Sequence, residues 1–234
     1  KIGFRAEVSS DPEQILKATK IILPGVGSYN NGMKNLQNMG LIPTLNQKVL
    51  EKGTPILGIC LGMQILMEGS EEGSIPGLGW IQGKAVKFNF VSDSTQYKIP
   101  HMGWNLVSPK VDSSYLLSGI QGSPRFYFVH SYHCLCNNPE DILATSNYGL
   151  DFVCMLNRNN IYGTQFHPEK SHRFGMRLLQ NFLELKTSST SQQNQRVMRG
   201  GEGPTYKSSD EEASLASTRT NRKTRIIPSL LLKH

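Results

Sequence analysis

The segment Thr54–Gln64 constrains the fold of this chain more than any other part of its sequence. A short apolar run leads there into the pattern Gly58-x-Cys60-x-Gly62. A cysteine flanked in this way at the end of a buried strand predicts a sharp strand-to-helix turn, because a side chain at either glycine would clash there. We therefore expect a strand, a turn that presents Cys60, and a helix over 62–67.

Short apolar runs alternate with helix-like stretches in the first third of the chain. Lys20–Leu23 is such a run, and residues 31–50 follow it with apolar residues at helical spacing and a break at Gly40–Pro43. This alternation indicates an α/β fold with an open, doubly wound and mostly parallel sheet flanked by helices. We expect an added antiparallel portion downstream, where six strand-like runs precede an amphipathic helix over 174–185. These runs are 80–90, 103–107, 126–134, 142–146, 151–156 and 161–166.

The composition changes after Lys186. Residues 187–224 are rich in Ser, Thr, Gln, Gly and Arg and hold almost no large apolar side chains. Such a stretch cannot bury enough surface to offset its ordering entropy. We therefore expect a folded domain over 1–186, a disordered linker over 187–224, and a separate apolar segment over 225–234 that has no strand partner in this chain.

The net charge of +7 gives little reason to expect a nucleic-acid partner. Residues 187–234 carry eight Lys or Arg and four Asp or Glu, so +4 of the total lies outside the expected domain. The domain itself shows no basic stripe with interleaved aromatics. No apolar run approaches the roughly 18 residues that would predict a membrane span, and no signal peptide is visible, although the chain begins with Lys.

Cysteine usage points to a reducing compartment. The four cysteines include no CxxC pair, and the Cys134-x-Cys136 spacing is too tight for a usual zinc site. We expect free thiols, no metal or other cofactor, and a cytoplasmic location.

Cys60 is the candidate nucleophile. The helix expected after it would direct the positive end of its dipole at the sulfur, which favours the reactive thiolate. The backbone N–H of Leu61 would point to where an oxyanion develops. An isolated cysteine at a strand end is more often a small buried residue. The flanking glycines favour the functional interpretation, because a merely packed cysteine needs no such turn.

A thiol nucleophile needs a base, and His167 is the best placed of the six histidines. It follows the expected strand 161–166, and the ends of parallel strands share one edge of a sheet, where Cys60 also lies. Glu169 is close enough to orient the imidazole. Alone, His-Pro-Glu could be a structural histidine beside a solvated glutamate. Together with the turn at Cys60, it favours a triad of Cys60, His167 and Glu169.

These motifs resemble those of the class I glutamine amidotransferases. The match rests on the segments Gly58–Gln64 and Gln165–Glu169. The resemblance implies that L-glutamine is the substrate and that Cys60 forms a γ-glutamyl thioester with release of ammonia. It also implies that His167 is the general acid and base and that Glu169 orients it.

Four further strings are similar to those of the glutaminase subunits of imidazole glycerol phosphate synthases, which serve histidine biosynthesis. They are Leu23–Gly27, Pro100–Asn105, Phe126–Tyr132 and Gln165–Ser171, and the resemblance covers most of residues 1–186. It implies an oxyanion hole, a glutamine-binding group and a partner interface. The oxyanion hole would use Gly25, Val26, Gly27 and Leu61; the glutamine-binding group would be Gln64, Glu72, Ser131 and Tyr132; the interface would include His101, Trp104 and Lys170.

Each of these residues also has an ordinary structural interpretation. Outside the motifs, Trp104 could be a core residue, Glu72 a solvated turn residue and Ser131 a strand hydroxyl. The motif context is what favours the functional roles.

The resemblance also exposes differences at both ends of the chain. The family begins with a strand and a helix before the segment that opens here, so we expect residues 1–186 to lack a central strand. Arg225–His234 resembles the opening strand of the cyclase (βα)₈ barrel that partners such glutaminases, so we expect a barrel subunit or fused domain as partner. Leu231 stands where that strand usually carries an acid–base aspartate. A barrel that only conducts ammonia and a chance alignment are equally good explanations.

Three alternative functions remain open. The ammonia could serve the amidation of a surface polysaccharide or a nucleotide sugar. The chain could be a non-catalytic regulatory domain that kept the fold, although the complete triad argues against this. A cysteine peptidase is disfavoured, because Gln64 and Glu72 suit free glutamine better than a peptide.

Overall fold

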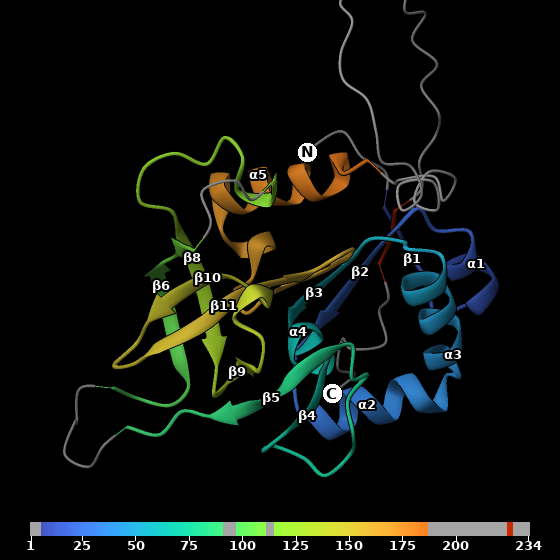
Figure 1. The fold of residues 1–234 in the computed structure, drawn as a ribbon, viewed down its shortest axis with the longest axis horizontal. Coiled ribbons are helices and arrows are strands. Elements are labelled where there is room, and N and C mark those ends of the chain that lie inside the picture. Colours follow the sequence, from blue (N-terminus) through green and yellow to red (C-terminus); the bar gives the residue numbers. More distant parts are fainter. Residues whose placement is uncertain (1–5, 91–96, 111–114, 187–223, 227–234) are drawn as a thin grey trace, which may run out of the picture. The chain divides into compact units, whose positions relative to one another are not determined.

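The computed structural model describes residues 6–90, 97–110, 115–186 and, as backbone only, 224–226. These residues belong to one compact unit that is built on a large mixed sheet (Figure 1). Its strands are β1 (Ala6–Val8), β2 (Lys20–Gly25), β3 (Ile56–Cys60), β4 (Met67–Ser70), β5 (Ile81–Lys87), β7 (Ser108–Pro109), β9 (Tyr132–Cys136), β10 (Ile142–Asn147), β11 (Asp151–Arg158), β12 (Ile161–Thr164) and β13 (Thr224–Ile226). Two further strands, β6 (His101–Leu106) and β8 (Arg125–His130), form a separate antiparallel pair.

Helices cover both faces of the large sheet. They are α1 (Pro12–Leu16), α2 (Tyr29–Asn38), α3 (Leu41–Asn46), α4 (Leu61–Ile65) and α5 (His172–Glu184), with a π-helical turn over Gln47–Glu51 and 3-10 turns over Tyr115–Leu117, Pro139–Asp141 and Pro168–Lys170. Figure 1 shows α5 on one face of the sheet and α2 and α3 on the other. No helix within the described ranges is long and apolar enough to cross a membrane.

The sheet has a parallel half and an antiparallel half. Its order is β1-β13-β2-β3-β12-β11-β9-β5-β4, and the first five of these strands run parallel. From β12 to β5 each neighbour runs antiparallel, and β4 returns parallel to β5. The predicted α/β class, with an open sheet, flanking helices and an antiparallel addition, is therefore confirmed.

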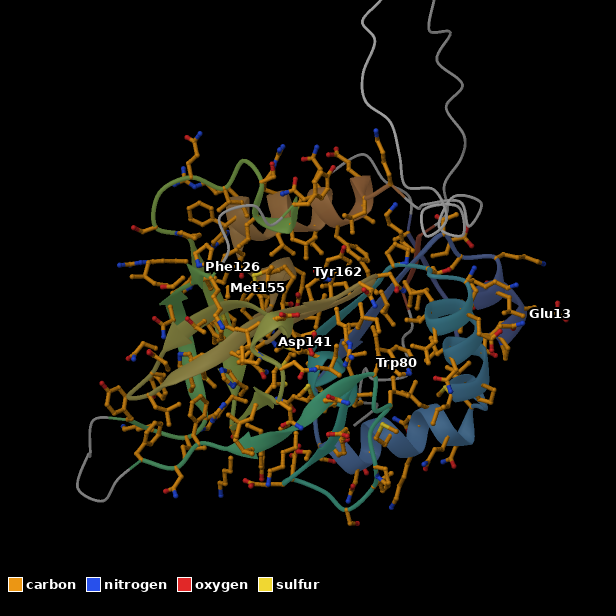
Figure 2. All side chains as sticks on the ribbon, in the orientation of Figure 1. Glu13, Trp80, Phe126, Asp141, Met155 and Tyr162 are labelled. Atoms are coloured by element: carbon orange, nitrogen blue, oxygen red, sulfur yellow. The ribbon has the colours of Figure 1, made fainter. Side chains whose placement is uncertain are left out.

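The core consists of two apolar clusters, one on each face of the sheet. Side chains along a strand point alternately to opposite faces, so Ile21 and Leu23 enter one cluster and Ile22 enters the other. The first cluster includes Trp80 and lies under α2 and α3. The second lies under α5 and includes Phe126 and Met155 (Figure 2). This two-sided burial explains why the central strands are almost wholly apolar in sequence.

One expected element differs from the structure, and one expected break is present. The run 126–134, expected as one strand, is wrong: the chain bends at Ser131, with β8 pairing β6 and β9 pairing β5 and β11. Apolar residues continue through the bend, so periodicity does not mark it. The break expected at Gly40–Pro43 within the helical stretch 31–50 is confirmed at Gly40, whose φ of 64° suits the left-handed region that glycine tolerates, and α3 begins at the next residue.

Thr224–Ile226 pairs on both sides. It lies parallel to β1 and to β2, with Arg225 opposite Glu7 and Ile21. The expectation that this segment has no strand partner in the chain, and that a central strand position stays empty, is therefore wrong for these three residues. The assignment of 187–224 as a linker lies outside the described residues except for Thr224, and the assignment of 225–234 to the start of a barrel stays a prediction.

Candidate functional site

Cys60 lies at the tip of a strained strand-to-helix turn. It ends β3 and immediately precedes α4, with φ 54° and ψ −109°, a conformation that L-residues seldom adopt. A Cβ added to Gly58 would lie 2.7 Å from the carbonyl oxygen of Gly62. One added to Gly62 would lie 1.9 Å from the carbonyl oxygen of Leu23. Both glycines are thus required by close backbone packing, as expected from the sequence, and such strain is typical of functional positions.

The fold brings His167 to the same edge of the sheet. β12 is the parallel neighbour of β3, with Thr164 opposite Ile59, and His167 follows β12 as Cys60 ends β3. The hydroxyl of Ser171 holds the His167 backbone: it donates to the His167 carbonyl at 2.6 Å and accepts from the Tyr127 N–H at 3.0 Å. The His167 N–H donates to the Tyr127 carbonyl at 2.9 Å. The backbone that carries the imidazole is therefore held by β8 and by Ser171, the residue that precedes α5.

Glu169 contacts the outer nitrogen of the imidazole. Its Oε1 lies 2.7 Å from Nδ1 of His167, a short distance for a charge-assisted hydrogen bond. A carboxylate can only accept, so Nδ1 carries the proton and Nε2 points inward. Nε2 is buried and has no hydrogen-bond partner within the described structure. An inward nitrogen of this kind is free to exchange a proton with a reacting group.

The charges around His167 favour its protonated form. Burial lowers the pKa of His167, but its interactions with Cys60 and with the Glu169 carboxylate outweigh burial and raise the pKa to about 9. Burial raises the pKa of Glu169, but the contact with His167 lowers it by more. The net pKa of Glu169 is therefore below its ordinary value. The pair is thus an imidazolium and a carboxylate at neutral pH.

The other cysteines lie in environments that suppress reactivity. Burial raises the pKa of Cys134 and Cys154 well above the ordinary value, and burial raises that of Cys136 to about 11. All three remain neutral thiols near pH 7. Cys60 is a free cysteine that lines a pocket and has an imidazolium as its neighbour in the fold. It is therefore the thiol suited to nucleophilic chemistry.

A pocket of about 360 Å³ opens above Cys60 and His167. This volume is at the lower end of small-molecule sites, which suits a ligand of amino-acid size. Most of the residues predicted for the site line it together: Val26, Gly27, Cys60, Leu61, Gln64, Glu72, Ser131, Tyr132 and His167. Gly25 does not line the pocket but pairs with Cys60 across β2 and β3. Glu169 does not line the pocket either; it contacts Nδ1 of His167.

Hydrogen bonds fix the polar wall of this pocket. The side-chain amide of Gln64 donates to the carbonyl of Tyr132 at 3.0 Å and to Oε1 of Gln165 at 3.2 Å. Both of its amide protons are thereby used within the protein, so only its side-chain oxygen can serve a ligand. Glu72 accepts from the N–H of Tyr29, at the start of α2, through one carboxylate oxygen. Gln165 in turn places its Nε2 3.7 Å from the sulfur of Cys60.

Of the three residues predicted for a partner interface, Trp104 and Lys170 are exposed and contact the same Tyr127 ring, whereas the third is buried. Trp104 is 46% exposed and stacks on His172, with ring centroids 5.1 Å apart. Lys170 is exposed and lies 5.8 Å from the Tyr127 ring. His101 is only 3% exposed, so its placement on a partner-facing surface is wrong. It is the first inward-facing residue of β6, a strand that begins two residues earlier than expected.

Several residues of the site were not predicted. Pro100, Val129 and His130 line the pocket. Gln165 contacts the sulfur of Cys60, and Ser171 donates a hydrogen bond to the His167 carbonyl. Pro100 and His130 lie inside the strings that carried the family resemblance, but the pairing of β6 with β8 is needed to see that they meet. Among the described residues, no three His, Cys, Asp or Glu side chains are grouped as metal ligands.

Comparison with known proteins supports the same family throughout the folded region. The family model described as glutamine amidotransferase class-I matches residues 4–185. A relative named imidazole glycerol phosphate synthase subunit HisH 2, from Methanococcus maripaludis, is 53% identical over 184 residues, which cover 79% of this chain and 89% of the relative. A protein of the same name from Pseudomonas aeruginosa is 49% identical over 185 residues, covering 79% and 90%.

The fold comparison agrees. A solved structure described as a glutamine amidotransferase superposes with a TM-score of 0.58 at 20% identity, over 78% of this chain and 87% of that one. This likeness concerns the fold alone. The family match includes the strand-to-helix turn at Cys60 and the end of β12 near His167. The chain belongs to the class-I glutamine amidotransferase family, among relatives of the HisH subunit of imidazole glycerol phosphate synthase.

Proposed function

We propose that this chain is the glutaminase of an imidazole glycerol phosphate synthase-type enzyme: it hydrolyses glutamine and delivers the ammonia to a cyclase partner in histidine biosynthesis. The observation that carries the proposal is the juxtaposition of Cys60 and the His167–Glu169 pair in a pocket of amino-acid size. Family membership and the named relatives supply the substrate and the partner.

Cys60 and His167 divide the chemistry between them. The sulfur attacks the carboxamide carbon of glutamine and forms a C–S bond, while His167 gives its Nε2 proton to the leaving nitrogen, so that ammonia departs and a γ-glutamyl thioester remains. A water molecule then loses a proton to His167 and attacks the thioester. Glutamate leaves and the sulfur is restored. Glu169 stabilises the imidazolium in both steps.

The oxyanion formed in each step needs backbone donors. The N–H of Leu61 at the start of α4 and those of the Gly25–Gly27 loop are the candidates. Val26 and Gly27 line the pocket and are exposed, and Gly27 has φ 100°. A peptide with this freedom can reorient, which suits a loop that completes the oxyanion hole only when a partner binds.

The amino-acid end of glutamine would lie against the polar wall. Glu72 uses one carboxylate oxygen for Tyr29 and can offer the other to the substrate ammonium group. The side-chain oxygen of Gln64 is a second acceptor for that group, and Ser131 and Tyr132 complete the lining. A pocket with acceptors at one end and the sulfur at the other selects a free amino acid rather than a peptide.

The partner is a (βα)₈ barrel that docks beside the face carrying Trp104 and Lys170. It is a separate subunit or is fused through residues 187–224, and neither nucleic acid nor a membrane takes part. A second acceptor class, a surface or nucleotide sugar, rests on the resemblance of Arg225–His234 to the opening strand of a cyclase barrel, in which Leu231 would stand at the position of the acid–base aspartate. A leucine cannot transfer protons, so such a barrel would conduct ammonia without closing an imidazole.

One experiment separates these two acceptors. Glutamate release from glutamine is measured for this chain together with its barrel, with and without each candidate acceptor. Stimulation by the phosphoribosyl formimino intermediate of histidine synthesis supports the histidine function and excludes the interpretation of Leu231. Absence of that response, with Cys60 still labelled by a glutamine analogue, assigns the ammonia to sugar amidation.

Without the barrel, the chain is expected to be nearly silent as a glutaminase. The reason is the oxyanion loop, since loss of one correctly placed donor costs roughly 10²- to 10³-fold in turnover. Addition of the barrel should therefore raise glutamate release by about 10²-fold or more. The measurement is the initial rate of glutamate formation at saturating glutamine. Full activity of the chain alone would contradict the need for partner-induced ordering.

Glutaminase activity is expected to fall on the alkaline side near pH 9. The folded-state pKa of His167 is raised from 6.5 to about 9, so the imidazolium that protonates the leaving ammonia persists through neutral pH and is lost as pH rises through 9. Replacing Glu169 with glutamine removes one of the groups that raise this pKa. The alkaline limb of the kcat/KM profile should then move to lower pH, and the maximum rate should fall.

The control for this profile is Glu184→Gln. Glu184 is an acidic residue at the end of α5 that contacts Gln180 rather than the site. Its neutralisation should leave the alkaline limb in place. An unchanged limb in Glu169→Gln would show that the carboxylate does not act through the pKa of His167.

A further inference from the structure

Two buried histidines that the proposed chemistry does not use lie beside the pocket: His130 lines it, and His101 contacts His130. His101 on β6 and His130 on β8 occupy opposite positions in the antiparallel pair. Nδ1 of His101 lies 3.0 Å from Nε2 of His130. Nδ1 of His130 lies 2.8 Å from the carbonyl oxygen of Tyr132. Three consecutive polar groups thus form a connected row that ends at the pocket.

The end of this row determines where its protons sit. A carbonyl oxygen can only accept, so Nδ1 of His130 must carry a proton. If the ring is neutral, its Nε2 is an acceptor, and Nδ1 of His101 must then donate to it. Nε2 of His101 is left as an acceptor, 3.5 Å from the side-chain amide of Asn105. Each ring is therefore a neutral Nδ1–H tautomer.

The surroundings keep both rings uncharged. Burial lowers the pKa of His101 to about 4, and burial lowers that of His130 to about 3. Aromatic rings enclose the pair: Tyr148 stacks on His101 with centroids 4.0 Å apart, and Phe88 lies 5.2 Å from His130. Protonation of either ring would place a charge in an apolar setting, which costs free energy. Each neutral ring instead donates one hydrogen bond from Nδ1, toward the Tyr132 carbonyl, and keeps Nε2 as an acceptor.

The Tyr132 carbonyl is the point where this row meets the glutamine pocket. It accepts from His130 and from the amide of Gln64 at the same time. The Gln64 amide can keep its oxygen directed to a ligand only while its two protons have these internal acceptors. Movement of the Tyr132 carbonyl would therefore change the orientation of Gln64. His130 is the group that restrains that carbonyl from the far side.

We propose that His101 and His130 form a neutral, one-directional hydrogen-bonded pair that positions the Tyr132 carbonyl and, through it, the Gln64 amide for glutamine binding. Both are positioning residues: neither contacts the reacting atoms, and His101 acts through His130. This inference rests on the proposed glutaminase function for its ligand. The arrangement of the two rings themselves does not depend on that function.

The row also begins on a strand with an exposed apolar face. Met102, Trp104 and Leu106 project outward from β6, while His101 and Asn105 face the opposite side. The side-chain amide of Asn105 also donates to the carbonyl of Asn147 at 2.6 Å, which anchors this end to β10. The pair is thus held at both ends, as a positioning element requires.

The tautomers are tested first, in the unmodified chain. Long-range ¹H–¹⁵N spectra at pH 7 should show both rings neutral with the proton on Nδ1, whereas the Nε2–H form is the commoner one for an unconstrained histidine. A proton on Nε2 of either ring, or an imidazolium, would overturn the proposal. This measurement involves no variant and no substrate.

Positioning is tested by labelling Cys60 with a thiol-directed glutamine analogue, such as acivicin, in variants of the full chain assayed together with its barrel. His101→Leu and His130→Leu should raise the half-saturating analogue concentration by about five- to tenfold, the effect of losing one neutral hydrogen bond, and leave the limiting rate nearly unchanged. His101→Asn keeps a donor near the Nδ1 position and should recover most of the affinity. Alkylation by iodoacetamide, which needs no glutamine pocket, should be equal in all variants.

His133→Leu is the matched control. His133 is a third buried histidine of the same aromatic cluster, 4.8 Å from Phe88, and its Nδ1 has no hydrogen-bond partner within the described residues. Equal loss of affinity in this variant, or wild-type affinity in His101→Leu, would overturn the positioning role. If a leucine variant does not fold, as judged by thermal unfolding, His101→Asn and the ring tautomers decide. Absence of saturable Cys60 labelling in the wild-type chain bound to its barrel would instead refute the proposed function.

Discussion

Replacing Cys60 with alanine is expected to abolish glutamine-dependent synthesis by the complex with its barrel and to leave ammonia-dependent synthesis unchanged. The sulfur is the atom that bonds to the substrate, and loss of the nucleophile of a catalytic triad lowers turnover by roughly 10⁴-fold or more. The barrel does not use this sulfur, so ammonia added to the solution should still reach the acceptor. The measurement is product formation with glutamine and, separately, with an ammonium salt at alkaline pH.

Cys136→Ala is the matched control for this experiment. Cys136 is a partly buried thiol on β9 whose pKa is raised by burial, and it lies outside the pocket lining. Its replacement should leave both activities close to wild type. Loss of ammonia-dependent synthesis in Cys60→Ala would mean that Cys60 supports the structure of the complex rather than the chemistry of glutamine.

The features that were predictable from sequence are those encoded by local pattern. The Gly58-x-Cys60-x-Gly62 turn is steric, because both glycines face backbone at distances that exclude a Cβ. The meeting of Cys60 and His167 followed from a general rule, since both residues follow neighbouring parallel strands. Neither inference required knowledge of which side chains pack together.

The features that were missed depend on pairing between distant segments. The bend at Ser131 separates β8 from β9, but the aromatic and apolar pattern continues across it, so a single strand was expected. His101 was assigned to a partner-facing surface from the family resemblance of the string Pro100–Asn105, and the strand there was expected to begin only at Gly103. Starting the strand at residue 101 turns that histidine inward, opposite His130. The pairing of β6 with β8, which the sequence string does not encode, is what buries this histidine.

The pairing of Thr224–Ile226 with β1 and β2 shows the same limit. Three residues of a parallel strand carry too little pattern to specify a partner about 200 positions away in sequence. The composition of the tail predicted a strand-forming segment, and it could not predict where that strand would pair.

Gly62→Ala is expected to destabilise the chain and to disable the site, even though alanine is the better helix former. Alanine gains about 1 kcal/mol of helix propensity over glycine. Against this, its Cβ would lie 1.9 Å from the carbonyl oxygen of Leu23, well inside van der Waals contact, and both groups belong to secondary structure that cannot yield locally. Forcing α4 away from β2 should cost about 3 kcal/mol or more in the free energy of unfolding.

The same displacement should reach the chemistry. α4 carries Leu61, whose N–H is the proposed oxyanion donor, and β2 leads into the Gly25–Gly27 loop. Separation of the two elements would misplace both donors relative to the sulfur of Cys60. We therefore expect the midpoint of urea unfolding to fall and the labelling of Cys60 by a glutamine analogue to slow by about 10²-fold, the cost of one misplaced donor.

Gly69→Ala separates packing from the general effect of the substitution. Gly69 lies in β4, its φ is not positive, and a Cβ added there would meet nothing within 4 Å. This variant should unfold at nearly the wild-type urea concentration and label at the wild-type rate. If Gly62→Ala matched it in both measurements, α4 would not pack on β2 as closely as the structure places it. The steric explanation of the glycines that flank Cys60 would then be wrong, and with it the reason that the turn presents its sulfur to the pocket.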